Sequence, residues 1–205
     1  MIYLDHAATS FPKPTEVVAA VQRWFTEVGV SADRGDGPAT TECTAVVRRC
    51  RAGVAAMTGH RPARVAFCSG ATEGLNLTLR ALTTSGGRAL TTTYEHSSVV
   101  RPLQALREER GLEVARFGSI QELCEAMRTS DLVVLTHASN VTGEVFDAAA
   151  VVRAARSMGA RVVLDASQTA GYLALDVGAD VVVASAHKAL HGPPGLGFVL
   201  SLIHI

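Results

Sequence analysis

The chain has 205 residues, of which 48% are apolar and 19% are charged, and its formal net charge at pH 7 is zero. This composition is typical of a soluble globular protein with one or two domains. A neutral chain offers no electrostatic basis for binding nucleic acid or an anionic membrane surface. No apolar run reaches the roughly 18 residues of a membrane span.

The N-terminal residues 1–6 lack a basic stretch followed by an apolar one, so they do not read as a secretory signal. The four cysteines have no CxxC spacing, which favours buried, reduced thiols in a cytoplasmic protein; they are Cys43, Cys50, Cys68 and Cys124. Four histidines lack the spacing of a metal site, so none is predicted: His6, His60, His191 and His204.

Two helices are expected first, over about Thr15–Val28, which follows Pro14, and over Thr41–Thr58. Seven strands follow, several rich in Val, Leu and Ala without alternation, as in strands covered on both faces. They are Arg64–Cys68, Arg88–Thr93, Glu113–Phe117, Asp131–Thr136, Arg161–Leu164, Asp180–Ala184 and Gly197–Leu200. Amphipathic segments between most of them predict helices over Leu75–Leu82, Val99–Arg110, Ile120–Arg128 and Ala148–Met158. The alternation predicts an α/β fold: a mostly parallel seven-stranded sheet with helices on both faces.

The sequence stops at or just after the seventh strand, with no helix to cover that strand. Residues 201–205 also resemble translated sequencing-adapter read-through. We therefore expect a truncated reading frame with a non-native tail over residues 201–205. A genomic read that shows a natural stop codon at this point would contradict this expectation.

Polar clusters follow five of the seven predicted strands, each at the carboxyl end. They are Ser69–Glu73, Tyr94–Ser98, His137–Asn140, Asp165–Gln168 and Ser185–Lys188. Ligands of open α/β sheets bind outside the carboxyl ends of the strands. The shared position of the clusters therefore predicts one site at this edge of the sheet.

Lys188 ends the last of these clusters and is one of only two lysines in the chain; the other is Lys13. The remaining cationic side chains are all arginines. A lysine amine can lose its proton and attack a carbonyl, which an arginine cannot do. Lys188 at the end of a buried strand therefore suggests a covalently held aldehyde cofactor.

The segment Gly70–Thr72 joins a strand to a helix, so free N–H groups at the helix start could bind an anion. Taken alone, the segment is better explained as a helix N-terminus without a ligand. Asp165 follows a buried strand, where a carboxylate is costly unless paired. A protonated ring nitrogen would be a suitable partner, and the alternative is a cap for the turn after the strand.

The other polar residues of the clusters are each open to two interpretations. His96 could stack on a planar ring or could simply begin a helix, and His187 could donate to a phosphate or be unremarkable. Asn140 could bind a phenolic oxygen or be a plain turn residue. His137 is assigned to packing.

Six segments together resemble the class V aminotransferase family of pyridoxal-phosphate enzymes, and most closely its cysteine desulfurase branch. They are Tyr3–Thr9, Ser69–Glu73, Glu95–Ser98, Ser139–Gly143, Asp165–Thr169 and Ser185–Lys188. The resemblance runs from Met1 to about Leu200. It implies the large domain of fold-type I over residues 16–200, with residues 1–15 belonging to the small domain at the rim of the site and the C-terminal small domain missing.

The resemblance also implies a catalytic role for two residues. Lys188 would hold pyridoxal 5′-phosphate as a Schiff base and later move the substrate Cα proton, and His96 would stack on the ring and assist proton transfer. Asp165 would keep the pyridine nitrogen protonated. Gln168 and Asn140 would bind the side of the ring that bears the phenolic oxygen.

The remaining roles concern the phosphate and the substrate. The phosphate would be held by the Ala71 backbone and by three side chains: Thr72, Ser185 and His187. The substrate carboxylate would lie near Ala7 and Ala8, beside Asn140. In the family, a second subunit normally contributes to the phosphate site, so the full-length protein is expected to be a homodimer.

The implied reaction converts L-cysteine to L-alanine, as an enzyme thiolate attacks the substrate sulfur and becomes a persulfide. A sulfur-acceptor protein would then be a partner. In the family, the persulfide cysteine and the carboxylate-binding arginine lie in the C-terminal half, and none of the four cysteines of this chain matches that position. We therefore expect incomplete activity. The alternatives are another class V enzyme (a selenocysteine lyase, an aminotransferase or an epimerase) and a non-catalytic fragment.

Overall fold

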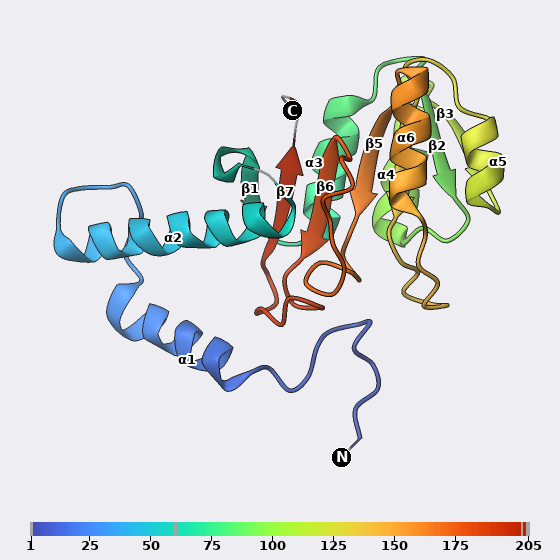
Figure 1. Cartoon of the computed structure of the whole chain (residues 1–205). Helices are drawn as coiled ribbons and strands as arrows, with labels where there is room; N and C mark the ends of the chain where they lie inside the picture. The colour runs from blue at the N-terminus through green and yellow to red at the C-terminus, as the bar shows by residue number, and fades with distance from the viewer. Residues whose placement is uncertain (1, 60, 202, 204–205) are drawn as a thin grey trace.

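The computed structural model describes residues 2–59, 61–201 and 203. In this part of the chain, seven strands form one sheet in the order β1-β7-β6-β5-β4-β2-β3 (Figure 1). The strands are β1 (Val65–Cys68), β2 (Arg88–Thr92), β3 (Glu113–Phe117), β4 (Leu132–Thr136), β5 (Arg161–Asp165), β6 (Val181–Ser185) and β7 (Gly197–Ser201). Only β7 runs antiparallel to its neighbours within these residues. The predicted mostly parallel α/β sheet is therefore confirmed, with strand ends shifted by one residue at most.

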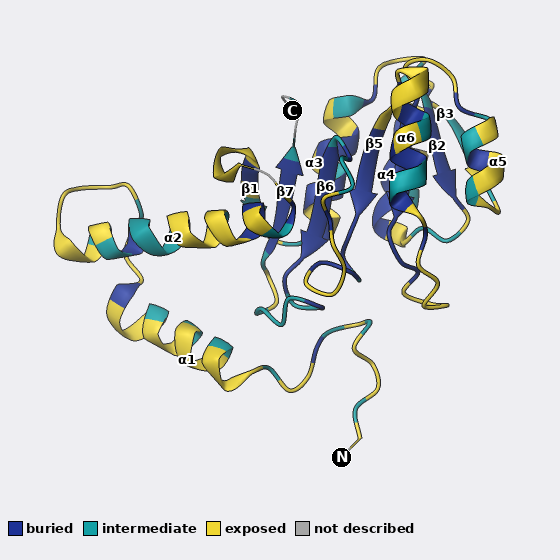
Figure 2. Ribbon diagram, viewed as in Figure 1, coloured by how far each residue is buried: buried dark blue, intermediate teal, exposed yellow. Residues whose placement is uncertain are grey.

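The central strands are buried on both faces, as their unbroken apolar sequences predict. In β4, Val133 and Leu135 pack into one core, whereas Leu132 and Val134 pack into the other. Strands β5 and β6 divide their side chains in the same way, and the dark band of buried residues in Figure 2 follows these strands. The sheet thus separates two apolar layers and forms a rigid support for the loops at its edge.

Helices cover both of these layers. Helices α3 (Ala71–Leu82) and α4 (Ser97–Arg110) pack on one face, and α5 (Ile120–Glu125) and α6 (Ala148–Met158) pack on the other. The α3 prediction began four residues late, because the first turn of α3 carries polar side chains ahead of its apolar ones. The α5 prediction ran to Arg128, but the chain turns after Glu125 and the backbone N–H of Arg128 donates to Asp131 at 2.7 Å.

The N-terminal helices project away from the sheet (Figure 1). Helix α1 (Thr15–Arg23) continues into a π-helical turn, η1 (Trp24–Val28), and α2 (Pro38–Met57) begins three residues earlier than predicted because a proline is tolerated at the first helical position. A short 3₁₀ turn, η2 (Pro62–Arg64), leads into β1. Only the C-terminal part of α2, with Val54 and Ala55, joins the core.

The four cysteines are free, as expected, but the prediction that they are buried is correct for Cys43 alone. Cys68 and Cys124 are half-buried. Cys50 is exposed, because the middle of α2 extends beyond the core. Among the described helices, none combines the length and the apolar character needed to cross a bilayer.

Candidate active site

The carboxyl ends of the five parallel strands β1, β2, β4, β5 and β6 meet at one edge of the sheet, where they surround a cavity of about 240 Å³. All nine residues that the sequence suggests for a cofactor line this cavity: Ala71, Thr72, His96, Asn140, Asp165, Gln168, Ser185, His187 and Lys188. An adjoining cavity of about 510 Å³ shares Asn140 and Gln168 and is lined by Ala7. Ala8 is exposed and lines neither cavity.

One end of the first cavity is built from the start of α3 and the end of β6. The backbone N–H of Ala71 donates to Ser185 Oγ at 2.9 Å, which joins two clusters that are 114 residues apart. The first turn of a helix has N–H groups without helical partners and carries partial positive charge. With the Thr72 hydroxyl beside it, this end of the cavity suits an anionic group such as a phosphate.

Asp165 lies in the floor of the cavity with only 4% of its surface exposed. Its Oδ1 accepts hydrogen bonds from the backbone N–H and the hydroxyl of Ser167. Since both hydrogen bonds found within the described residues go to Oδ1, Oδ2 remains available to a donor in the cavity. The cap suggested for Asp165 is therefore present, and it leaves one oxygen for a ligand.

Lys188 also lines the cavity and is half-buried. Burial lowers the pKa of its amine, and the Asp165 carboxylate opposes this by favouring the protonated form. A lowered pKa increases the fraction of free amine near neutral pH, and the free amine is the form that attacks a carbonyl. The direction of this shift makes the amine of Lys188 more available for attack on a carbonyl group.

His96 is the N-cap of α4 as well as a wall of the cavity. Its Nδ1 accepts from the Ser98 backbone N–H at 3.1 Å and lies 2.8 Å from Ser98 Oγ. The sequence left a helix-start role and a ring-stacking role open, and the geometry accommodates both. The bonds at Nδ1 fix the orientation of the ring and leave Nε2 for the site.

Gln168 and Asn140 lie where the two cavities meet. The Gln168 side-chain amide donates to the Ala7 carbonyl at 3.0 Å, so the N-terminal segment is held against the sheet edge. Asn140 projects from a turn in which Ser139 Oγ accepts from two backbone N–H groups. His137 is buried, with Nδ1 2.9 Å from Thr169 Oγ1, as the packing assignment predicts.

Sequence reasoning gave no role to several residues that the fold brings to the site. Ser98, Thr136 and Ser167 line the cavity, and each lies within or beside a polar cluster. Glu95 is not among the residues that line the cavity, but its carboxyl group accepts from the Thr92 hydroxyl at 2.8 Å and from the N–H of the cavity residue Thr136 at 3.0 Å. Burial, opposed only in part by these bonds, raises the pKa of Glu95 to about 7.

Another overlooked residue is Lys13, whose Nζ lies 2.7 Å from the carbonyl oxygen of His187. Burial lowers the pKa of His187, and the charges of Lys188 and Lys13 lower it further. Within residues 2–59, 61–201 and 203, no group of three or more His, Cys, Asp or Glu side chains is placed to hold a metal ion.

Comparison with known proteins places the chain beside a well-defined group of enzymes. Residues 2–202 match the family model described as aminotransferase class-V. A probable cysteine desulfurase from Methanothermobacter thermautotrophicus is 31% identical over 212 residues, which cover 97% of this chain and 52% of that protein. A cysteine desulfurase from a Frankia species is 34% identical and is likewise covered over 52% of its length.

Solved structures agree with these sequence matches. A cysteine desulfurase from Thermococcus onnurineus, in its apo form, superposes with a TM-score of 0.89 at 27% identity, over 98% of this chain and 53% of that one. The sheet and its covering helices therefore match the large domain of a fold-type I enzyme. The chain spans about half the length of the curated relatives it matches.

Proposed function

The chain belongs to the aminotransferase class-V family, whose members depend on pyridoxal 5′-phosphate, and from this premise we propose that it holds that cofactor in the cavity at the sheet edge. The observation that carries the proposal is the convergence of three chemically distinct groups in one cavity. These are an anion-binding helix start at Ala71, a buried carboxylate at Asp165 and a half-buried amine at Lys188. An aromatic aldehyde that bears a phosphate and a basic ring nitrogen needs these three partners.

The donors of the cavity fit such a molecule. The Ala71 backbone, Thr72, Ser185 and His187 would hold the phosphate, and Oδ2 of Asp165 would accept a charge-assisted hydrogen bond from the protonated ring nitrogen. Lys188 would bond covalently to the aldehyde carbon as a Schiff base. When bound, the cofactor supplies an electron sink that stabilises negative charge at the substrate Cα.

Side chains of this chain would transfer protons and orient the ring. The Lys188 amine would take the proton from the substrate Cα and return it. His96, held through Nδ1 by Ser98, would pack on one face of the ring and exchange a proton at Nε2. Gln168 and Asn140 would orient the ring from the side that faces the adjoining cavity, where Ala7 would border the substrate carboxylate.

We further propose that the whole protein is a cysteine desulfurase that converts L-cysteine to L-alanine and passes the sulfur to an enzyme cysteine. This rests on the names of relatives of which the chain covers about half. In this proposal, residues 16–200 form the cofactor-binding large domain, and residues 1–15 form its rim. The protein would act as a cytoplasmic homodimer and would deliver sulfur to an acceptor protein.

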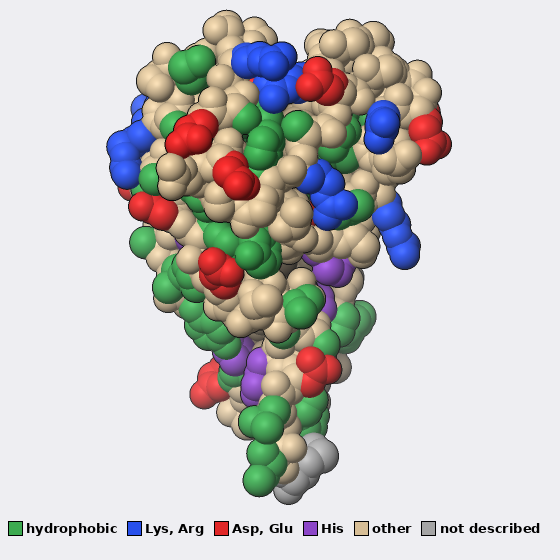
Figure 3. Space-filling view, turned by 90° about the vertical axis from the view of Figure 1, so that its right-hand side faces the viewer, with side chains coloured by type: hydrophobic (Ala, Val, Ile, Leu, Met, Phe, Trp, Pro, Cys, Tyr) green, Lys and Arg blue, Asp and Glu red, His purple; other side chains and the backbone are tan. Residues whose placement is uncertain are grey.

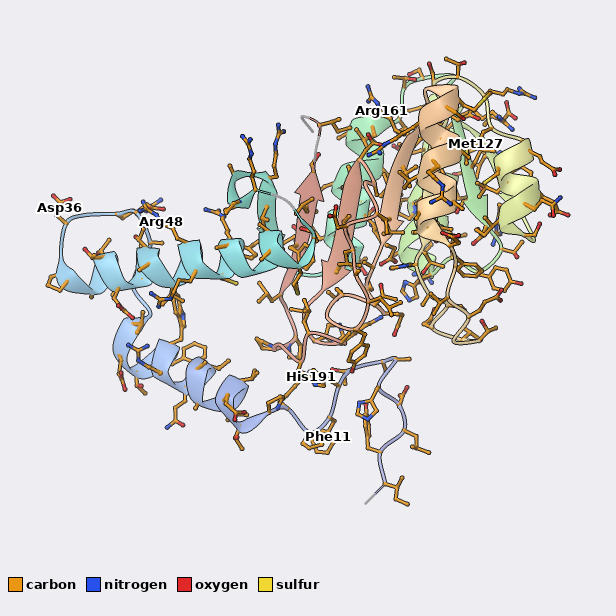
Figure 4. The ribbon with its side chains drawn as sticks, viewed as in Figure 1. Phe11, Asp36, Arg48, Met127, Arg161 and His191 are labelled. Carbon is orange, nitrogen blue, oxygen red and sulfur yellow. The ribbon has the colours of Figure 1, made fainter. Side chains whose placement is uncertain are left out.

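The test of cofactor binding is an absorbance titration of the chain with pyridoxal 5′-phosphate. We expect a band near the edge of the visible range that Lys188→Ala abolishes. The matched control is Arg161→Ala, which removes a cationic side chain at the amino end of β5, remote from the cavity (Figure 4). A band that survives in Lys188→Ala would contradict the assignment of Lys188. Release of alanine from cysteine by the whole protein, with sulfide set free when an added thiol reduces the enzyme persulfide, tests the reaction, and release of another amino-acid product would favour a different class V activity.

A further inference from the structure

The carbonyl group of His187, which precedes Lys188 in the chain, receives several donors from the N-terminal segment. Its oxygen lies 3.0 Å from the Ser10 backbone nitrogen, 3.0 Å from Thr9 Oγ1, 3.1 Å from Ser10 Oγ and 2.7 Å from Lys13 Nζ. The His187 ring also approaches Thr9, with Nδ1 3.1 Å from Oγ1. A segment more than 170 residues away in sequence therefore encloses one peptide group of the site.

Lys13 is the charged member of this group. Its Nζ lies 2.7 Å from Ser10 Oγ as well as from the His187 carbonyl oxygen, so the ammonium group links the two. A hydrogen bond from a charged donor is about twice as strong as a neutral one. Of all the groups around this carbonyl, Lys13 is therefore the one expected to hold it most firmly.

The backbone around Lys13 is stiff. Pro12 and Pro14 have fixed φ angles, and the proline that follows Lys13 restricts Lys13 itself to extended conformations. The same segment is held at Ala7 by Gln168. Figure 4 shows Phe11 and His191 at the same edge of the molecule, where this segment passes the loop that follows β6. Lys13 is thus presented to that loop from a segment with little freedom of its own.

The loop that carries Lys188 is held internally on its other side. Ala186 N–H donates to the Leu196 carbonyl at 2.9 Å, Gly192 N–H donates to the Ala186 carbonyl at 2.8 Å, and His191 N–H donates to the Lys188 carbonyl at 2.9 Å. None of these three bonds involves the carbonyl group of His187. The orientation of the His187–Lys188 peptide therefore depends on the contacts made by the N-terminal segment. That peptide sets the direction in which the Lys188 side chain leaves the backbone.

We propose that Lys13 is a positioning residue that fixes the His187–Lys188 peptide through its ammonium group and so directs the Lys188 amine into the cavity. The inference rests on the proposed role of Lys188 as the residue that bonds to an aldehyde cofactor. In this proposal the two lysines of the chain act together: Lys13 supplies a fixed cation, and Lys188 supplies a reactive amine.

A competing explanation is that Lys13 only anchors the N-terminal segment, or that it acts through the His187 side chain on the phosphate. Binding of pyridoxal 5′-phosphate and of pyridoxal, which lacks the phosphate, separates these explanations. The variants are Lys13→Met, which keeps the length of the side chain but removes the charge, and Lys13→Arg, which keeps a cationic donor. The control is Arg34→Met, which removes a positive charge from the exposed loop before α2.

We expect Lys13→Met to lower the binding affinity for both ligands on the order of tenfold, equivalent to ~1.4 kcal/mol. The absorbance band that depends on Lys188 should also become weaker. Lys13→Arg should recover most of the loss, and Arg34→Met should match the parent chain. A loss confined to pyridoxal 5′-phosphate, or equal binding of both ligands by Lys13→Met and the parent chain, would overturn the proposal.

Hydrogen–deuterium exchange of the chain without cofactor gives a second readout. Lys13→Met should accelerate exchange in residues 186–192 while the thermal midpoint stays near that of the parent, whereas uniform acceleration throughout the sheet would overturn the proposal. If Lys13→Met fails to fold, Ser10→Ala removes the hydroxyl that the ammonium contacts and serves in the same comparison. A parent chain that binds neither ligand would refute the proposed function, and the exchange experiment would still test whether Lys13 fixes the loop.

Discussion

Gly197 at the start of β7 lies so close to Gly70 that a Cβ atom on Gly197 would come within 2.6 Å of the Gly70 Cα and 2.8 Å of the Ala184 carbonyl oxygen. The antiparallel direction of β7 causes this contact. The first residue of β7 pairs with Cys68 on one side and with Ser185 on the other, where the parallel strands end. The turn that begins α3 can therefore pack against the sheet edge only because residue 197 has no side chain.

Gly197→Ala should consequently destabilise the fold and open the anion-binding end of the cavity. Backbone atoms surround the added methyl group, so relief requires a shift of the Gly70 turn, and overpacking of this kind costs ~1–3 kcal/mol. Urea unfolding followed by circular dichroism measures the loss. Titration with pyridoxal 5′-phosphate should show that the molecules which remain folded bind the cofactor more weakly than the parent chain does.

The matched control is Gly53→Ala in α2, where nothing lies within 4 Å of the added methyl group. Alanine is favoured over glycine in a helix interior by roughly 0.5–1 kcal/mol, so this variant should be stabilised. Equal effects of the two substitutions would show that crowding at Gly70 is not the cause.

The raised pKa of Glu95 should make the free energy of unfolding decrease as the pH rises. The pKa of its carboxyl group is raised from 4.5 to about 7 in the folded chain, mainly by burial. The folded state therefore holds a proton on Glu95 that the unfolded state releases between pH 4.5 and 7. The stabilisation is complete below pH 4.5 and is lost as the pH rises through about 7, where the total difference is on the order of 3 kcal/mol.

Glu95→Gln isolates this contribution, because the glutamine oxygen can still accept from Thr92 and Thr136 while the ionisable proton is gone. Urea unfolding at pH 5, 6, 7 and 8 should give a smaller decline in unfolding free energy for the variant than for the parent chain. Parallel pH profiles for the two proteins would argue that the Glu95 carboxyl group stays ionised in the folded state.

The strands and the shared position of the polar clusters could be predicted because both depend on local sequence. The apolar run Val162–Leu164 predicts a strand buried on both faces, and this strand places Asp165 at its carboxyl end. The direction of β7 and the contact between Lys13 and His187 could not be predicted, since each depends on a long-range approach of segments. The carboxyl group of Glu95 escaped notice for the same reason, because one of its two donors is Thr136 of β4, which is 41 residues away in sequence.

The pairing of Lys188 with Asp165 can be tested without cofactor, because the chain contains only two lysines. Protein labelled with ¹³C-lysine should give two side-chain signals, and Lys13→Met identifies which one belongs to Lys188. The pKa of Lys188 should lie below 10.5 because of burial, and the Asp165 carboxylate keeps it from falling further. Asp165→Asn removes that negative charge but retains an oxygen for the Ser167 donors.

The Lys188 pKa should therefore fall again in Asp165→Asn, while the Lys13 signal, whose pKa is lowered by burial alone, should titrate as before. The sign follows from Coulomb's law, since a nearby carboxylate stabilises the protonated amine. An unchanged Lys188 titration would mean that solvent screens the two groups from each other. The carboxylate would then have no electrostatic influence on the amine at the position where it must meet an aldehyde.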